Sequence, residues 1–302
     1  MKSVKVVFAG TPNVALPSLS ALVDSAHEIV QVISMPDAPL GRNRVMTPSP
    51  VSQMALDLAL PLTRIRTFDG DTRELLTRIQ PDIGIVVAFG ALIPEDVLAI
   101  PAHGWLNLHF SRLPDLRGAA PLQRAVMRGD QDLYTTVFRL VPALDAGPIL
   151  SIEKHTPPSP ATASELLSTL AHTGARQLLD ALDRISDGSA RFQNQEGAPT
   201  YAAKLSLDDG RFRFDETGKQ SFSRFRAVTS EPGFWFLDRD IRVKILDAHP
   251  STIELQPGEL AVVGGRTYLG TATTALHIER VHPAGKKPMN AGDWMRGRQL
   301  SE

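Results

Sequence analysis

Two polar side chains with acid–base and hydrogen-bonding chemistry, Asn107 and His109, lie on one short, mostly apolar segment. Residues 105–110 predict a β-strand, and Pro114 lies in the turn that follows it. Because side chains two positions apart share a face of a strand, both side chains project together. An amide can donate a hydrogen bond to an oxyanion, and an imidazole can exchange a proton near neutral pH. The pair predicts a proton-transfer site at the carboxyl end of a strand, where open α/β sheets bind ligands.

A carboxylate that can complete this site is supplied by Asp145, which lies in a predicted loop between strands at 135–141 and 149–155. Such a carboxylate can orient the imidazole or accept a proton through water. Ser111 could act as a nucleophile beside His109 in the manner of a hydrolase. The Gly-x-Ser-x-Gly turn of those enzymes is missing around Ser111, so we discount that role.

The composition removes several classes of chemistry. The chain has 302 residues, which is long enough for two domains, and it has no cysteine. Disulfides, thiolate metal sites and a cysteine nucleophile are therefore excluded. The eight histidines show neither His-Glu-x-x-His nor a short paired spacing, so we predict no metal. The net charge of −1 does not itself indicate a nucleic-acid partner, although a local basic patch can still bind phosphates.

The amino terminus leads directly into a predicted strand, without the pattern of a signal peptide. No apolar run reaches the length that spans a membrane. We therefore expect a cytoplasmic protein that does not bind a membrane. Nothing in the sequence demands more than a monomer.

Strands and helices alternate up to about residue 190, which predicts an α/β domain with a largely parallel sheet. The first strand runs into a turn at Gly10, as in a Rossmann-like fold, but the Gly-x-Gly-x-x-Gly fingerprint is missing, so we do not predict NAD. The expected strands cover residues 4–8, 28–34, 83–89, 105–110, 135–141 and 149–155. The expected helices cover residues 17–23, 51–60, 71–79, 95–100, 119–128 and 161–185.

The character of the chain changes after residue 190. Residues 191–207 are polar and turn-rich, which is typical of a linker between a domain at 1–190 and another at 208–302. Short β-like runs separated by turn signals predict a small β-barrel in the second domain. These runs cover residues 234–237, 241–246, 259–263, 267–270 and 275–281, after one helix at 221–228.

The segment from residue 35 to 50 is rich in proline and predicts a long loop that carries Arg42 and Arg44. Loops of this length inside a compact domain are commonly functional or mobile. The two guanidinium groups could meet phosphate oxygens, with which they pair well. They could equally be solvated surface groups, and the sequence favours neither interpretation.

The flanks of the Asn107–His109 pair carry a more specific signal. The runs Asn-Leu-His-Phe-Ser-Arg-Leu-Pro at 107–114 and Arg-Gly-Ala-Ala-Pro at 117–121, with Asp145 downstream, resemble the 10-formyltetrahydrofolate-dependent formyltransferases. Segments near residues 8–12 and 87–94 are also similar to that family. The runs at 201–205, 232–235 and 285–289 resemble its transfer-RNA branch. The resemblance implies a Rossmann-like formyltransferase domain followed by an OB-like barrel that binds transfer RNA.

The resemblance also implies roles for particular residues. The catalytic set would be Asn107, His109 and Asp145. The folate-binding residues would be Phe89, Gly90, Ala91, Leu92, Ser111, Arg112, Leu113 and Pro114. The transfer-RNA contacts would be Arg42, Arg44, Lys286 and Lys287. Arg112 stands where the family usually has leucine, and a side chain that points to solvent there would leave folate binding unchanged.

The activity implied is formyl transfer from 10-formyltetrahydrofolate, as co-substrate, to the methionine amine of initiator methionyl-tRNA. Other family members use the same donor with another acceptor, such as an amino sugar or water, and this is the alternative enzyme. A third hypothesis is an RNA-binding protein on an inactive formyltransferase scaffold. The intact set of Asn107, His109 and Asp145 speaks against that third hypothesis.

Overall fold

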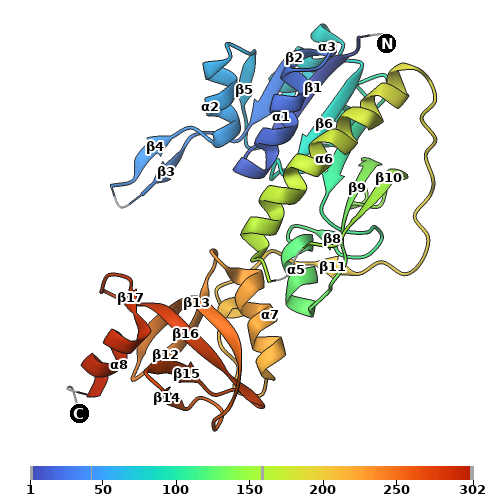
Figure 1. The fold of residues 1–302 in the computed structure, drawn as a ribbon. Helices are drawn as coiled ribbons and strands as arrows, with labels where there is room; N and C mark the ends of the chain where they lie inside the picture. Colours follow the sequence, from blue (N-terminus) through green and yellow to red (C-terminus); the bar gives the residue numbers. More distant parts are fainter. Residues whose placement is uncertain (1–2, 42, 158–159, 300–302) are drawn as a thin grey trace. The chain divides into compact units, whose positions relative to one another are not determined.

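The computed structural model describes residues 3–41, 43–157 and 160–299 (Figure 1). The chain forms two compact units. The first unit contains Met1–Gly118, Leu133–His155 and Leu167–Tyr201, and the second contains Ala119–Asp132, Thr156–Leu166 and Ala202–Glu302. The domain boundaries proposed at residues 190 and 208 stay a prediction. None of the helices in the described part of the chain has the length and apolar character needed to cross a bilayer.

A seven-stranded sheet forms the centre of the first unit, in the order β10-β9-β7-β6-β1-β2-β5. The strands from β7 to β5 pair in parallel, whereas β9 pairs antiparallel with both β7 and β10. This arrangement confirms the α/β class and the largely parallel sheet. The strands are β1 (Lys5–Gly10), β2 (Glu28–Ser34), β5 (Leu62–Arg64), β6 (Ile83–Val87), β7 (Trp105–His109), β9 (Leu133–Arg139) and β10 (Ile149–His155).

The connecting helices begin where local sequence signals place them. Ser49 caps α2 by accepting a hydrogen bond from the Ser52 amide, and Asp69 caps α3 in the same way with Thr72. The helices and short turns of this part are η1 (Asn13–Ala15), α1 (Leu16–Val23), α2 (Pro50–Asp57), α3 (Gly70–Ile79), α4 (Glu95–Leu98) and α6 (Ala163–Ser186). Two short strands are β8 (Arg117–Gly118) and β11 (Tyr201–Ala202).

Both faces of the parallel sheet are covered, which explains its nearly continuous apolar strands. On one face, Trp105 packs in a buried cluster with residues of α3 and α4. A Cβ added to Gly84 would lie 2.1 Å from the Trp105 ring, so this close packing requires glycine. On the other face, a Cβ added to Gly174 of α6 would lie 2.7 Å from Leu108. Strand β7 is therefore held from both sides.

The segment from residue 35 to 50 is not the irregular loop that the sequence predicts. It forms a two-stranded antiparallel sheet of β3 (Ala38–Leu40) and β4 (Val45–Thr47), visible as an arm in Figure 1. Strand β3 is exposed throughout and β4 nearly so. A strand pair without a buried face leaves no alternating apolar pattern, so the hydrophobic periodicity could not reveal it.

The second unit contains a six-stranded antiparallel sheet, as expected for a small β-domain. Its strands are β12 (Phe234–Asp238), β13 (Ile241–Glu254), β14 (Leu260–Val263), β15 (Arg266–Leu269), β16 (Thr274–Pro283) and β17 (Met289–Asn290). Its helices and turn are α5 (Pro121–Arg128), η2 (Asp208–Gly210), α7 (Gly218–Val228) and α8 (Ala291–Gln299). The capping box of Thr217 and Gln220 starts α7.

Two elements of the second unit differ from the prediction. Strand β13 continues to Glu254 rather than ending at residue 246, and register shifts between Ile245 and Ala248 interrupt its pattern. Helix α8 was not predicted, because two glycines and several charged residues give it little intrinsic preference for a helix. Its Trp294 packs edge-on against Phe236, with ring centroids 5.9 Å apart, so tertiary packing stabilises this helix.

Candidate active site

Strand β7 places Asn107 and His109 near its carboxyl end, opposite Phe138 and Thr136 of β9. His109 is buried, whereas Asn107 is only half-buried. The Asn107 amide makes no side-chain hydrogen bond with any described residue. An amide that is positioned by a sheet but not used by the fold is available to bind a ligand.

The hydrogen bonding of His109 defines the tautomer of its imidazole. Its Nε2 lies 2.9 Å from the carbonyl oxygen of Leu116, and a carbonyl can only accept, so Nε2 carries the proton. Burial lowers the pKa of His109 below its ordinary value of 6.5, against the opposing effects of the Asp145 carboxylate and the Leu116 hydrogen bond. The imidazole is therefore neutral at pH 7, with an unprotonated Nδ1.

Asp145 faces that unprotonated nitrogen. Its Oδ2 lies 3.9 Å from His109 Nδ1, and its side chain is 10% exposed. The same oxygen accepts a hydrogen bond of 2.7 Å from the Gly118 amide. A lone pair and a carboxylate at this separation can hold a proton-bearing group between them or stabilise an imidazolium once it forms.

The loop that carries Asp145 is held by a residue that the sequence analysis missed, Gln195. Its Nε2 donates hydrogen bonds to the carbonyl oxygens of Asp145 and Gly147, at 2.7 and 2.8 Å. Its Oε1 accepts hydrogen bonds from Arg117, at 2.6 Å from Nη2 and 3.2 Å from Nε. Asp145 itself has a φ of +47°, in the left-handed region that non-glycine residues rarely occupy. Gln195 thus helps to fix a strained turn in one conformation.

The segment around Gln195 makes further contacts within the first unit. Thr200 Oγ1 accepts a hydrogen bond of 2.8 Å from the Leu116 amide, next to the carbonyl that binds His109. Gln193 and Ile149 exchange two backbone hydrogen bonds, of 2.7 and 2.8 Å. The polar, turn-rich composition gave no signal of these contacts, because each partner lies far away in the sequence.

We expect the substitution Gln195→Ala to lower kcat by roughly tenfold to 10²-fold, because a small displacement of a catalytic group has effects of that size. The Michaelis constants should change little, because Gln195 contacts the Asp145 loop rather than a ligand. Steady-state kinetics of the purified variant provide the measurement. Gln193→Ala is the matched control, since the Gln193 side chain is exposed and only its backbone is bonded. An equal decrease in kcat for both variants would contradict the positioning role.

The first group of predicted folate-binding residues follows β6. Phe89 is buried, and its carbonyl oxygen accepts a hydrogen bond of 2.7 Å from Thr11 Oγ1. Gly90 has a φ of +96°, which turns the chain away from the strand. Ala91 is half-buried, and Leu92 is 79% exposed. Leu92 is thus an apolar side chain that the fold leaves uncovered.

The second group is the tetrapeptide 111–114. Ser111 Oγ donates a hydrogen bond of 2.6 Å to the Asp115 carbonyl, which agrees with its exclusion as a nucleophile. Arg112 is exposed, and its guanidinium lies 5.5 Å from the centroid of the Tyr134 ring. Leu113 is buried and Pro114 is half-buried. Arg112 therefore lies on the surface, the arrangement in which it does not disturb the tetrapeptide.

The predicted transfer-RNA contacts lie on exposed segments. Arg42 lies outside the described residues. Arg44 is exposed in the turn between β3 and β4, beside the exposed apolar side chains of Leu40, Val45 and Met46. Lys286 and Lys287 are exposed in the connection between β16 and β17 of the second unit.

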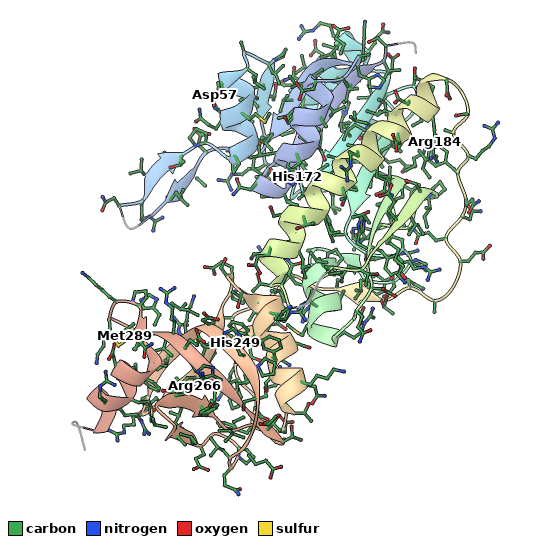
Figure 2. The ribbon with its side chains drawn as sticks, in the orientation of Figure 1. Asp57, His172, Arg184, His249, Arg266 and Met289 are labelled. Atoms are coloured by element: carbon green, nitrogen blue, oxygen red, sulfur yellow. The ribbon has the colours of Figure 1, made fainter. Side chains whose placement is uncertain are left out.

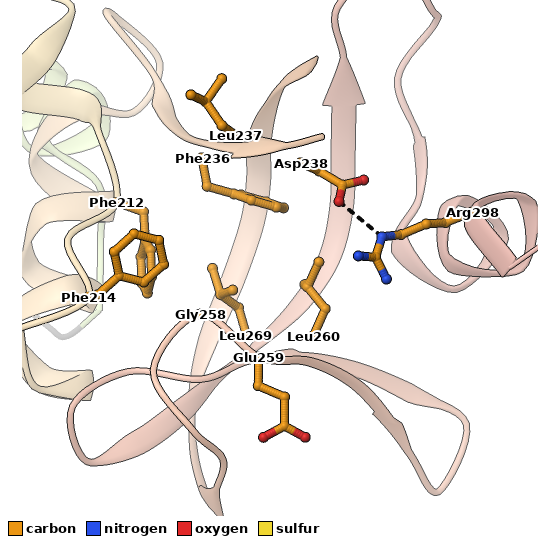
Figure 3. Close-up of a pocket in the computed structure, with 10 residues that line it drawn as sticks. All are labelled: Phe212, Phe214, Phe236, Leu237, Asp238, Gly258, Glu259, Leu260, Leu269 and Arg298. Carbon is orange, nitrogen blue, oxygen red and sulfur yellow. Dashed lines mark hydrogen bonds and ion pairs between the residues drawn. The ribbon is translucent and has the colours of Figure 1, made fainter. Parts of the chain in front are cut away.

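A hollow of about 330 Å³ opens in the second unit (Figure 3). Phe212, Phe214 and Phe236 line one part of it, and the ion pair between Asp238 and Arg298, with 3.0 Å between Oδ1 and Nε, borders another. Aromatic side chains beside charged groups can bind a planar apolar ligand. The sequence analysis did not single out this hollow.

Comparison with protein families agrees with this architecture. A model described as formyl transferase matches residues 1–182, and a model of the formyl transferase C-terminal domain matches residues 204–299. The α/β unit with its buried His–Asp pair and the antiparallel second unit are thus those of a formyl transferase, and the chain belongs to that family.

Individual relatives narrow this assignment. The methionyl-tRNA formyltransferase of Clavibacter sepedonicus is 42% identical, over 97% of this chain and 97% of its own. The methionyl-tRNA formyltransferase of Mycobacterium sp. (strain KMS) is 44% identical, over 98% of this chain and 97% of its own. Within the family, the chain groups with the methionyl-tRNA formyltransferases.

Solved structures share the fold at much lower identity. HypX from Aquifex aeolicus in complex with tetrahydrofolic acid is 17% identical with a TM-score of 0.67, over 98% of this chain and 47% of that chain. This chain thus spans about half the length of HypX. An N-formyltransferase from Helicobacter canadensis in complex with folinic acid and dTDP-3-aminofucose is 15% identical with a TM-score of 0.70, over 91% of this chain and 98% of that chain.

Proposed function

We propose that this protein transfers the formyl group of 10-formyltetrahydrofolate to the amino group of methionine on initiator methionyl-tRNA, in the cytoplasm and as a monomer. The observation that carries the proposal is the buried pair of His109 and Asp145 beside the Asn107 amide, which bonds no described residue, in a chain that belongs to the formyl transferase family. The identity of 42% over nearly the whole chain supports methionyl-tRNA as the acceptor.

The first step of the proposed mechanism is attack of the methionine amine on the formyl carbon. The attack forms a carbon–nitrogen bond and places a negative charge on the formyl oxygen. The Asn107 amide, which no described residue occupies, donates a hydrogen bond to that oxygen. His109 Nδ1 accepts the proton that the attacking amine loses, because its Nε2–H already bonds Leu116. Asp145, at 3.9 Å, stabilises the imidazolium that results.

The second step is collapse of the tetrahedral intermediate. The bond between the formyl carbon and N10 of tetrahydrofolate breaks, and the imidazolium of His109 returns its proton to the departing nitrogen. The products are formyl-methionyl-tRNA and tetrahydrofolate, and His109 is again neutral. A histidine with a lowered pKa suits both steps, because it releases the proton readily after accepting it.

We assign the folate to the two groups of residues around the carboxyl ends of β6 and β7, at 89–92 and 111–114. The exposed Leu92 supports this assignment, because an apolar pterin or benzoyl ring would cover it. We assign transfer-RNA contacts to Arg42, Arg44, Lys286 and Lys287. The exposed Arg44, Lys286 and Lys287 are accessible to phosphates.

The decisive experiment mixes the protein with 10-formyltetrahydrofolate and methionyl initiator transfer RNA and follows formyl-methionyl product. Uncharged transfer RNA and an RNA-free reaction are the controls. Product that forms only with the charged RNA supports the proposal. Deformylation of the folate without RNA, or formylation of an amino sugar alone, would instead support the alternative enzymes. Binding of charged RNA without turnover would support the inactive-scaffold hypothesis.

The double substitution Lys286→Ala with Lys287→Ala is expected to raise the Michaelis constant for transfer RNA and leave that for folate unchanged. Each phosphate that no longer meets a lysine should reduce the slope of log affinity against log salt by about one unit. Binding measured over a series of salt concentrations checks this expectation. Lys219→Ala is the control, because Lys219 is an exposed lysine on α7 of the same unit. Identical salt slopes for the double variant and the wild type would remove these lysines from the RNA surface.

A further inference from the structure

Two neighbouring strands of the second unit place four potential metal ligands together, away from the predicted catalytic residues. Asp247 and His249 are two positions apart on β13, and His277 and Glu279 are two positions apart on β16. His249 and His277 are direct partners in the antiparallel ladder. Because residues two apart share a face, the pairing gathers the four side chains on one side of the sheet. Figure 2 labels His249 on this strand.

The distances between these side chains resemble the edges of a metal coordination shell. His249 Nε2 lies 3.4 Å from Asp247 Oδ1 and 3.5 Å from Glu279 Oε1. Four ligands around a zinc ion, with bonds of about 2.0–2.2 Å, are separated by about 3.3–3.5 Å from one another. One candidate ligand atom from each of Asp247, His249 and Glu279 lies within 4.8 Å of the others. The two carboxylates therefore need only a modest approach to close the shell.

His277 stands beside these three groups. Its Nδ1 lies 3.8 Å from Glu279 Oε1, and its ring centroid lies 6.0 Å from that of His249. Tyr268 also packs against His277, with ring centroids 5.4 Å apart, and thereby restrains the imidazole. Arg266 is the nearby cation, and its charge is outweighed by the two carboxylates. The local balance of charge favours a bound divalent cation.

We propose that Asp247, His249 and Glu279 form a binding site for a divalent cation of the zinc type, with His277 or water as the fourth ligand. One imidazole with two carboxylates suits zinc, cobalt or nickel better than magnesium, which prefers oxygen ligands in an octahedral shell. Since the ligands come from β13 and β16, the ion would tie together the two central strands of the sheet. It would stabilise the second unit without taking part in formyl transfer.

The test titrates the full-length, tag-free protein, freed of metal with a chelator, with zinc chloride in a calorimeter at pH 7.5. We expect one equivalent to bind. His249→Gln should weaken binding by more than the roughly 10–100-fold that loss of an outer-shell partner costs. Glu279→Gln should also weaken it. Both side chains are nearly half exposed, so neither substitution removes a buried contact.

His103→Ala is the control, because His103 is an exposed histidine of the first unit and its replacement should leave the titration unchanged. Cobalt absorption provides a second readout, since a four-coordinate site gives intense visible bands that disappear in His249→Gln. Zinc should also raise the melting temperature of the wild type but not of His249→Gln. Binding of equal strength in the wild type and His249→Gln, or no binding by either, would overturn the proposal.

Discussion

The substitution His109→Ala is expected to lower kcat for formyl transfer by about 10²–10⁴-fold, the range that a positioned acid–base group contributes. The neutral imidazole accepts the amine proton at Nδ1, and no other described group combines that position with a pKa suited to the transfer. Single-turnover kinetics with saturating folate and charged transfer RNA measure the chemical step directly.

Because His109 is buried, a loss of activity has to be separated from a loss of structure. His109→Gln retains a donor for the Leu116 carbonyl and should fold, yet it should be as slow as His109→Ala. His155→Ala is the matched control, since His155 is a half-buried histidine of β10 in the same sheet. A folded His109→Gln protein with nearly wild-type turnover would remove His109 from the proton transfer.

The pH dependence gives an independent signature of the same group. Burial lowers the pKa of His109 below 6.5, and the neutral form is the active one. The rate of the wild type should therefore stay constant as the pH falls to 6.5 and decrease only below it. The residual activity of His109→Ala should lack this acidic limb. A wild-type limb centred above pH 6.5 would contradict the neutral histidine derived from the structure.

The second large effect is expected for Asn107→Ala, which should lower kcat by about 10²–10³-fold, as loss of one oxyanion donor does. The Michaelis constants should change little, because the hydrogen bond to the developing oxyanion forms in the transition state. The substitution should not unfold the protein, since the Asn107 amide bonds no described residue and is only half-buried.

Asn107→Asp distinguishes a hydrogen-bond donor from a residue that merely fills space. The carboxylate has the same shape as the amide but cannot donate when ionised, and its charge would repel the oxyanion. We expect this variant to be at least as slow as Asn107→Ala. If it retained most of the wild-type rate, the oxyanion would have to be stabilised elsewhere.

The strands and the residues of β7 were predictable because their signals are local. The alternation around Asn107 and His109 defines a face without any knowledge of tertiary structure, and the bounds expected for β2 and β10 agree with those observed. Helices with capping residues, such as α3 after Asp69, were equally accessible. In each case, neighbours in the sequence carry the information.

What escaped prediction depends on contacts between distant parts of the chain. The strands β3 and β4 stabilise each other without a buried face, and α8 relies on Trp294 against Phe236. Gln195 lies in a stretch with the composition of a spacer, and its partners are 48 to 78 residues away. The pairing of His249 with His277 likewise exists only in the ladder between β13 and β16, so their spacing in the sequence gave no metal signal.

The hydrogen bonds of Gln193, Gln195 and Thr200 determine where a catalytic fragment of this enzyme can end. A polypeptide cut after residue 190 would keep the predicted catalytic residues but lose the side chain that holds Asp145 and the hydroxyl that binds the Leu116 amide. A polypeptide that ends at Tyr201 would retain both. Gene fusions that exchange the carboxyl-terminal half of such a protein should therefore join downstream of Tyr201, and a protease nick between Gln193 and Thr200 should slow the reaction without removing any catalytic group.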